Sequence, residues 1–240
     1  MNDGSADEQL LKLVSPGSGP AISDVINLMQ AIDKLLPSND GLKWFNLLYL
    51  KVTSAVEGQL PGGGWSDAPW LTRLDVIFAG LYFSAVAGFL SHKDIPASWE
   101  ALFEARYTPG IDRVQFALAG MNAHINRDLA FALLQTDAEF KLQPDLNSPQ
   151  HDDFERVNGL LESVIPVALK FLATGILGEA AQDTGKIGRL LAIWNVRAAR
   201  DLAWDFSDHL RHLQGLSRDV AITAQDKLTG VIGRTILLST

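Results

Sequence analysis

The sequence feature that most limits the fold is the stretch from Val114 to Leu134, which contains one glycine and no proline. Its apolar residues recur at helical spacing, at about 100° per residue. On one side of such a helix they form a continuous seam, which consists of Val114, Leu118, Met121, Ile125, Leu129 and Ala132. The pattern therefore predicts a buried helix over about residues 112–135, at the centre of the fold.

The rest of the chain also shows helical periodicity, and it has no run of alternating polar and apolar residues that would indicate a strand. We therefore expect an all-α bundle of about eight helices around the central one. Residues 1–20 are expected to be a partly flexible N-terminal segment, and residues 21–240 a single helical domain. The expected helices are 6–14, 23–36, 42–60, 68–90, a short one from residue 98, 112–135, 151–174, 186–212 and 218–237.

Composition excludes several classes of function. The net charge of −8 argues against binding to a phosphate backbone, so no nucleic-acid partner is expected. The absence of cysteine excludes disulfides, thiolate metal sites and cysteine catalysis. The N-terminus lacks the features of a signal peptide, and the most apolar run, residues 76–90, is short for a membrane span. We expect a cytoplasmic protein without a membrane partner, in which that run is a buried core helix.

Five polar side chains occupy the seven positions from residue 122 to 128 of the otherwise apolar central helix. His124 and Asp128 are four residues apart, so they can meet on one flank of the seam, while Asn122 and Asn126 lie toward the other flank. A carboxylate beside an imidazole fixes its tautomer and raises its basicity, which suits a general base or a metal ligand. The alternative is a structural hydrogen bond at a helix interface.

A second polar face is predicted on the buried helix 42–60, where Asn46, Tyr49 and Thr53 share one side. Two polar faces lower the cost of their burial when they face one another. The sequence thus suggests an enzyme with an inter-helix cavity for a small, largely apolar substrate. In this hypothesis His124 transfers protons, Asp128 orients it, and Asn122 and Tyr49 position the substrate. The alternative is a non-catalytic ligand-binding or scaffold protein whose polar network only stabilises the core.

Three residues of the predicted helix 186–212 are further candidates for substrate binding. Arg197, Arg200 and Trp204 recur near one face of that helix. The two arginines are expected to form structural ion pairs with buried carboxylates such as Asp128 or Asp153, although an anionic ligand would suit them as well.

A metal-dependent hydrolase or cyclase is a further alternative. The His124–Asp128 spacing resembles half of a zinc-binding helix motif, and a divalent metal would need further ligands from residues 151–153 or the distal helix. The string HDDFE at 151–155 is similar to the acidic cluster of terpene cyclases, but its position at a helix start favours a capping role. The sequence contains no phosphate-binding loop or dinucleotide fingerprint, so it indicates no nucleotide cofactor.

Several segments together resemble an all-helical, mostly bacterial family catalogued as a domain of unknown function. They are WFNLLYLKVT (44–53), WSDAPW (65–70), LDVIFAGLYFSAV (74–86), QFALAGMNAHINRDLAFAL (115–133) and DDFERVNGLL (152–161). Of these, GMNAHINRDL is the most specific. The resemblance implies an all-helical fold and no particular activity. It marks eight polar motif positions, which are Asn46, Tyr49, Thr53, Asn122, His124, Asp128, Asp153 and Asn158.

Overall fold

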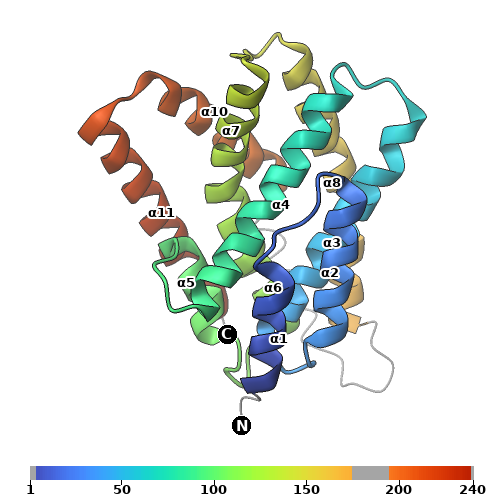
Figure 1. The fold of residues 1–240 in the computed structure, drawn as a ribbon, viewed down its shortest axis with the longest axis vertical. Coiled ribbons are helices and arrows are strands. Elements are labelled where there is room, and N and C mark those ends of the chain that lie inside the picture. Colours follow the sequence, from blue (N-terminus) through green and yellow to red (C-terminus); the bar gives the residue numbers. More distant parts are fainter. Residues whose placement is uncertain (1–3, 175–194, 239–240) are drawn as a thin grey trace.

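The computed structural model describes residues 4–174 and 195–238, and every regular element in this part of the chain is a helix, which confirms the predicted all-α fold. The helices form a bundle with both ends of the chain in the lower half of the view in Figure 1. Their bounds are α1 (Gly4–Val14), α2 (Ile22–Leu35), α3 (Gly41–Gln59), the 3-10 turn η1 (Leu60–Gly62), α4 (Ala68–Leu90), α5 (Ala97–Ala105), α6 (Arg113–Ala123), the π-helical turn η2 (His124–Asp128), α7 (Leu129–Phe140), α8 (Pro149–Thr174), α10 (Val196–His212) and α11 (Gly215–Leu238).

The predicted central helix is present and longer than expected. α6, η2 and α7 follow one another without a break in helical backbone from Arg113 to Phe140. Asp112 caps the start, and Lys141 ends the helix in a left-handed conformation with φ of 57°. All members of the predicted apolar seam are buried. The π-helical turn at its middle was not predicted, because apolar periodicity does not reveal one extra residue in a turn.

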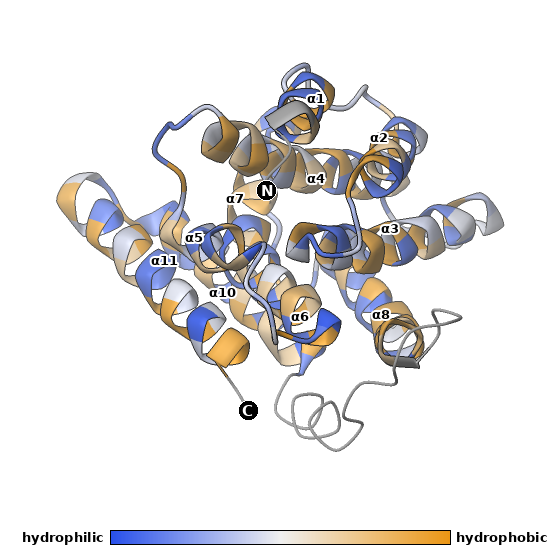
Figure 2. Ribbon diagram, turned by 90° about the horizontal axis from the view of Figure 1, so that it is seen from below, coloured by the Kyte–Doolittle hydropathy of each residue, from blue (hydrophilic) through white to orange (hydrophobic). Residues whose placement is uncertain are grey.

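Neighbouring helices enclose the central one. α3 packs mainly against α6, while α4 and α10 pack against α7. These are the three neighbours that the sequence predicted for the central helix. α11 also packs along α5 and α6, a contact that the sequence did not predict. It lies at the edge of the bundle, and Figure 2 shows hydrophilic and hydrophobic residues mixed along it.

One expected boundary differs from the structure. The helix predicted from residue 186 to 212 begins at Val196, because Asn195 is extended and its side chain accepts a hydrogen bond from Ala198 N at 3.1 Å. Residues 186–194 of that prediction lie outside the described residues. The helix expected over residues 6–14 is present as α1, which packs on α2 and α4 with Leu10 and Val14 buried.

The long apolar helix α4 meets the length and composition of a membrane span, but half of its most apolar 18-residue window is buried inside this fold. Its buried side chains include Trp70, Phe78, Tyr82 and Phe83. The expectation that residues 76–90 belong to a core helix agrees with this packing.

A buried ion pair joins the start of α3 to the end of α5. Arg106 is almost fully buried, and its Nη2 and Nε lie 2.5 and 3.0 Å from Oδ2 and Oδ1 of Asp40. Asp40 also caps α3 by accepting a hydrogen bond from Leu42 N at 2.9 Å. Because a buried guanidinium is costly without a partner, this pair fixes how α5 meets α3.

The backbones of α3 and α6 approach closely at Gly120. A Cβ atom added at Gly120 would lie 2.3 Å from Cγ of Phe45, a fully buried ring. Glycine is therefore needed here for space rather than for backbone freedom.

We expect Gly120→Ala to destabilise the protein by about 1–3 kcal/mol, because the buried ring of Phe45 has to move. Gly80→Ala in α4 is the matched control, since its added Cβ would meet no described atom within 4 Å. That control should gain about 0.5–1 kcal/mol from helix propensity. Chemical denaturation measures both changes, and equal effects at the two positions would contradict the close approach of α3 and α6.

Candidate functional site

The Asp128 carboxylate accepts three side-chain hydrogen bonds inside the core. Its Oδ2 lies 2.9 Å from Trp99 Nε1 and 3.2 Å from His124 Nδ1, and its Oδ1 lies 2.8 Å from Arg127 Nη1. The structure therefore brings His124 and Asp128 together as their spacing predicts. Because a carboxylate only accepts, the His124 proton is assigned to Nδ1, and Nε2 is left as the basic atom.

His124 is fully buried in a cluster of aromatic rings. Phe78 stacks on the imidazole with ring centroids 3.5 Å apart and an interplanar angle of 5°, and the Tyr49 ring meets it edge-on at 4.6 Å. Burial lowers the pKa of His124 below its ordinary value, and the hydrogen bond and charge of Asp128 oppose part of that shift. A lowered pKa keeps the imidazole neutral at pH 7, the state in which it can accept a proton.

A small cavity of about 40 Å³ adjoins His124. Among the described residues, its polar lining comes from four helical segments, namely Tyr49 on α3, Asp75 on α4, His124 on η2 and Arg200 on α10. The other described residues that line it are apolar: Val52, Val56, Phe78, Met121, Ile125, Val157 and Leu161. A cavity of this size has room for one or a few waters, or for a molecule of a few atoms.

Three polar atoms of the cavity residues lack a hydrogen-bond partner among the described residues. They are the Tyr49 hydroxyl, Asp75 Oδ2 and His124 Nε2, and all three are buried. Buried polar atoms without partners are costly and uncommon in native proteins. Their convergence on one cavity marks it as the candidate functional site.

Asp75 is the member of the site that the sequence did not single out. Burial raises the pKa of its carboxyl to about 7; the nearby Arg200 guanidinium opposes this rise and Glu57 adds to it. Burial also raises the pKa of Tyr49, with a further contribution from Asp75. One signal was available in the sequence, because Asp75 is the only charged residue in the apolar segment 74–86.

Arg200 does not form the ion pair with a buried carboxylate that the sequence predicted for it. It is almost fully buried, yet it forms no ion pair with any described residue. Its Nε donates to Asn158 Oδ1, its Nη2 lies 3.4 Å from the Phe154 carbonyl oxygen, and its guanidinium carbon lies 4.1 Å from the centroid of the Phe154 ring. Burial lowers the pKa of Arg200 to about 10, while the charges of Glu155, Asp201 and Asp75 raise it.

The expected carboxylate partners of the arginines have other contacts. Asp128 pairs with Arg127, and Asp153 accepts from the backbone N–H groups of Ser66 and Asp67 at 2.7 and 2.6 Å. Arg197 forms ion pairs as predicted, but with the more exposed Glu155 and Glu162 rather than with a buried carboxylate. It does not line the cavity.

Other predicted site residues lie elsewhere in the core. Asn46 bonds to the Met29 carbonyl oxygen at 2.9 Å and accepts from the Tyr82 hydroxyl at 3.4 Å, so it joins α2, α3 and α4. Thr53 is buried near Tyr49 and opposes part of the rise in the pKa of that phenol, although the two hydroxyls do not meet in hydrogen-bond geometry. Trp204 packs against Trp70, with ring centroids 6.4 Å apart, and against other aromatic side chains. None of the three lines the cavity.

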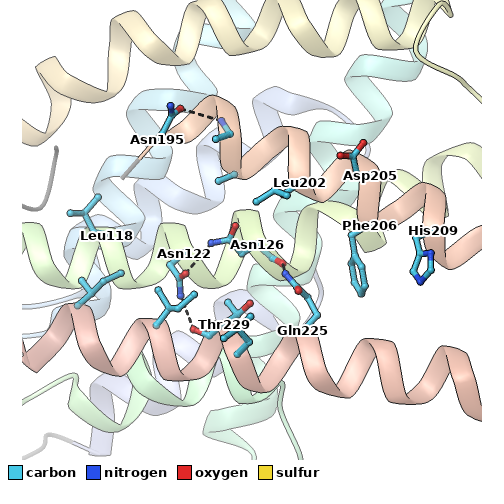
Figure 3. A pocket seen from close by; sticks show the side chains of 15 residues that line it. Leu118, Asn122, Asn126, Asn195, Leu202, Asp205, Phe206, His209, Gln225 and Thr229 are labelled. Atoms are coloured by element: carbon cyan, nitrogen blue, oxygen red, sulfur yellow. Dashed lines mark hydrogen bonds between the residues drawn. The ribbon is translucent and has the colours of Figure 1, made fainter. Parts of the chain in front are cut away.

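Asn122 and Asn126 face a different hollow, so the expected pairing of Asn122 with Tyr49 around one substrate is not present. They line a groove of about 640 Å³ between the central helix, α10 and α11, shown in Figure 3. Asn122 Nδ2 donates to the Thr229 carbonyl oxygen at 2.9 Å, and Asn126 Nδ2 donates to Asn122 Oδ1 at 2.9 Å. The remaining groove lining is mostly apolar and includes Leu118, Leu202, Phe206, Leu228, Ile232 and Ile236.

The metal alternative finds no centre in the described part of the chain. Within residues 4–174 and 195–238, no group of three His, Asp or Glu side chains is placed to hold a metal ion. His151 lies edge-on to the Trp204 ring at 4.7 Å, and Asp153 holds the loop before α4. The string HDDFE lies near the start of α8, as expected, but the side chain that accepts a hydrogen bond from its backbone there is Ser148, which lies 3.2 Å from His151 N.

Comparison with known proteins gives one match. A family model described as "Family of unknown function (DUF5995)" matches residues 22–239, nearly the whole chain. No curated protein and no solved structure matched the sequence. The segments that suggested an all-helical domain of unknown function lie within the matched region, and the chain belongs to the DUF5995 family.

Proposed function

We propose that the protein is an enzyme that transfers protons on a small molecule bound in the cavity at His124. The observation that carries this proposal is the convergence of three buried, unpartnered atoms on one cavity: the Tyr49 hydroxyl, Asp75 Oδ2 and His124 Nε2. Each belongs to a side chain that can accept or donate a proton. A bound substrate would give these atoms the partners that they lack among the described residues.

The roles follow from the hydrogen bonds. Asp128 holds His124 by its Nδ1, so Nε2 acts as the general base, and Asp128 is a positioning residue. The Tyr49 hydroxyl, whose pKa is raised, stays protonated and donates a hydrogen bond to the substrate. Asp75, with its pKa raised to about 7, holds or releases a proton near neutral pH.

The cavity also limits the substrate. At about 40 Å³ it admits only a few atoms next to His124. Its apolar walls suit the predicted largely apolar substrate, provided that the reacting part is small. The π-helical turn that carries His124 supports a functional role, because such turns occur frequently at functional sites.

A second candidate function is ligand binding in the groove. Its volume of about 640 Å³ and its apolar walls are typical of small-molecule sites. The buried polar network at Asp128 would then stabilise the core without taking part in chemistry.

Tyr49→Phe tests the proposed site without a known substrate. We expect the free energy of unfolding to stay unchanged or to rise by up to about 1 kcal/mol, because the lost hydroxyl has no partner among the described residues. Tyr82→Phe is the matched control and should lose about 0.5–1 kcal/mol, since its hydroxyl bonds to Asn46. If Tyr49→Phe costs as much as Tyr82→Phe, the Tyr49 hydroxyl has a structural partner and the main support for the proposal is lost.

His124→Gln tests the chemistry directly. Proton NMR in deuterated water would follow a pool of small carboxylic acids, carbonyl compounds and esters for turnover or deuterium uptake. We expect the wild type to change at least one compound and His124→Gln to leave it unchanged, while His212→Gln, exposed on α10 and outside both the cavity and the groove, behaves as the wild type. Full turnover of such a compound by His124→Gln would contradict the proposal.

The same pool of compounds distinguishes the two candidate functions, acid–base catalysis in the cavity and ligand binding in the groove. A compound that still binds to His124→Gln but not to Leu228→Arg occupies the groove. Val231→Arg is the control for that change, because Val231 is as exposed as Leu228 on α11 but does not line the groove.

A further inference from the structure

We propose that the substrate is a small carboxylic acid whose carboxylate group binds to Arg200 in the cavity that holds His124. The inference rests on the proposed function, since it assigns a substrate class to the same cavity.

Arg200 differs from the buried Arg106 and the partly buried Arg211. Arg106 pairs with Asp40 at 2.5 Å, and Arg211 pairs with Asp137 at 2.5 Å. Arg200 is only 5% exposed, and no carboxylate within residues 4–174 and 195–238 forms an ion pair with it. Buried charges in proteins are normally paired. The charges of Glu155, Asp201 and Asp75 raise the pKa of Arg200, but none of these carboxylates pairs with it directly. An anion bound in the cavity would supply a direct partner.

The Arg200 guanidinium donates hydrogen bonds from two of its three nitrogens to the described residues. Its Nε donates to Asn158 and its Nη2 to the Phe154 carbonyl oxygen, and the Phe154 ring lies against its plane. Its Nη1 makes no hydrogen bond to the described residues. These contacts fix the orientation of the side chain before any ligand binds. A fixed, planar fork of N–H donors matches the geometry of a carboxylate.

The other cavity residues fit a carboxylic acid better than a bulky anion. The volume of about 40 Å³ is suited to an acid of the size of formate or acetate and too small for a molecule with a sugar or a ring. Apolar side chains, among them Val157 and Leu161 from α8, can contact a methyl group. The Tyr49 hydroxyl and His124 Nε2 remain available to the rest of the molecule.

Binding of an anion here should depend on the protonation of Asp75. Asp75 on α4 is faced by Tyr49 and Glu57 from α3, His124 from η2 and Arg200 from α10, while α8 contributes apolar side chains. When ionised, Asp75 repels a bound carboxylate; when protonated, it can donate a hydrogen bond to it. Since its pKa is raised to about 7, affinity should be higher at about pH 6 than at about pH 8.

Acetate and formate are the probes, with sodium chloride at equal ionic strength as the reference. Two-dimensional NMR titration of the full chain should show saturable shifts for wild type with either acid. We expect Arg200→Gln to weaken acetate binding by about tenfold or more. Arg197→Gln is the matched control on the same helix and should bind as the wild type, because Arg197 pairs with exposed glutamates outside the cavity. Asp75→Asn should bind acetate with the pH dependence removed.

Circular dichroism checks the fold of each variant, and Arg200→Lys is the second variant should Arg200→Gln not fold. Lysine keeps the charge but loses the planar fork, so we expect weakened acetate binding in a folded protein. No saturable acetate or formate binding to wild type, or undiminished binding to a folded Arg200 variant, overturns the carboxylate assignment.

The two proposals fail in distinguishable ways. Turnover that depends on His124 without carboxylate binding at Arg200 keeps the acid–base function and removes the assigned substrate class. Acetate binding that depends on Arg200, together with full turnover by His124→Gln, keeps the anion site and removes the acid–base function.

Discussion

The hydrogen bonds to the buried Asp128 carboxylate are the interaction on which the rest of the structure depends. Trp99 reaches it from α5, and His124 and Arg127 reach it from the central helix. Burying a carboxylate is costly unless its oxygens are satisfied, so these donors must stay in place for the core to close. The network thereby locks α5 against η2 and sets the orientation of the imidazole, whose Nε2 is left for the cavity.

The π-helical turn separates two sets of polar side chains on one helix. His124 and Asp128 lie on the side of the aromatic cluster and the small cavity, whereas Asn122 and Asn126 line the groove beside α11. The fold thus offers an enclosed site with proton-transfer groups and a larger, mainly apolar hollow (Figure 3). Because the backbone of one turn lies between them, a ligand in either hollow contacts the same helical segment.

The sequence predicted the helices and the inward face of the central one, because apolar periodicity reports which side of each helix is buried. It also predicted the His124–Asp128 contact, which depends only on a spacing of four, and it included Tyr49 among the candidates. It did not predict that Arg200 would lack an ion pair or that Asp75 would join the site. Both depend on how α4, α8 and α10 pack together, and periodicity within one helix carries no information about its neighbours. The same reason explains why Asn122 was assigned to the wrong hollow, since the packing of α11 decides what it faces.

The most direct test of this account is the protonation state of His124 in the folded protein. Nitrogen-15 NMR of labelled histidine distinguishes the two ring nitrogens and follows their titration. We expect a neutral imidazole at pH 7 with its proton on Nδ1, and a pKa below the ordinary value of 6.5, because burial outweighs the effect of Asp128. A proton on Nε2, or a pKa above 6.5, would contradict the claim that His124 presents a free base to the cavity.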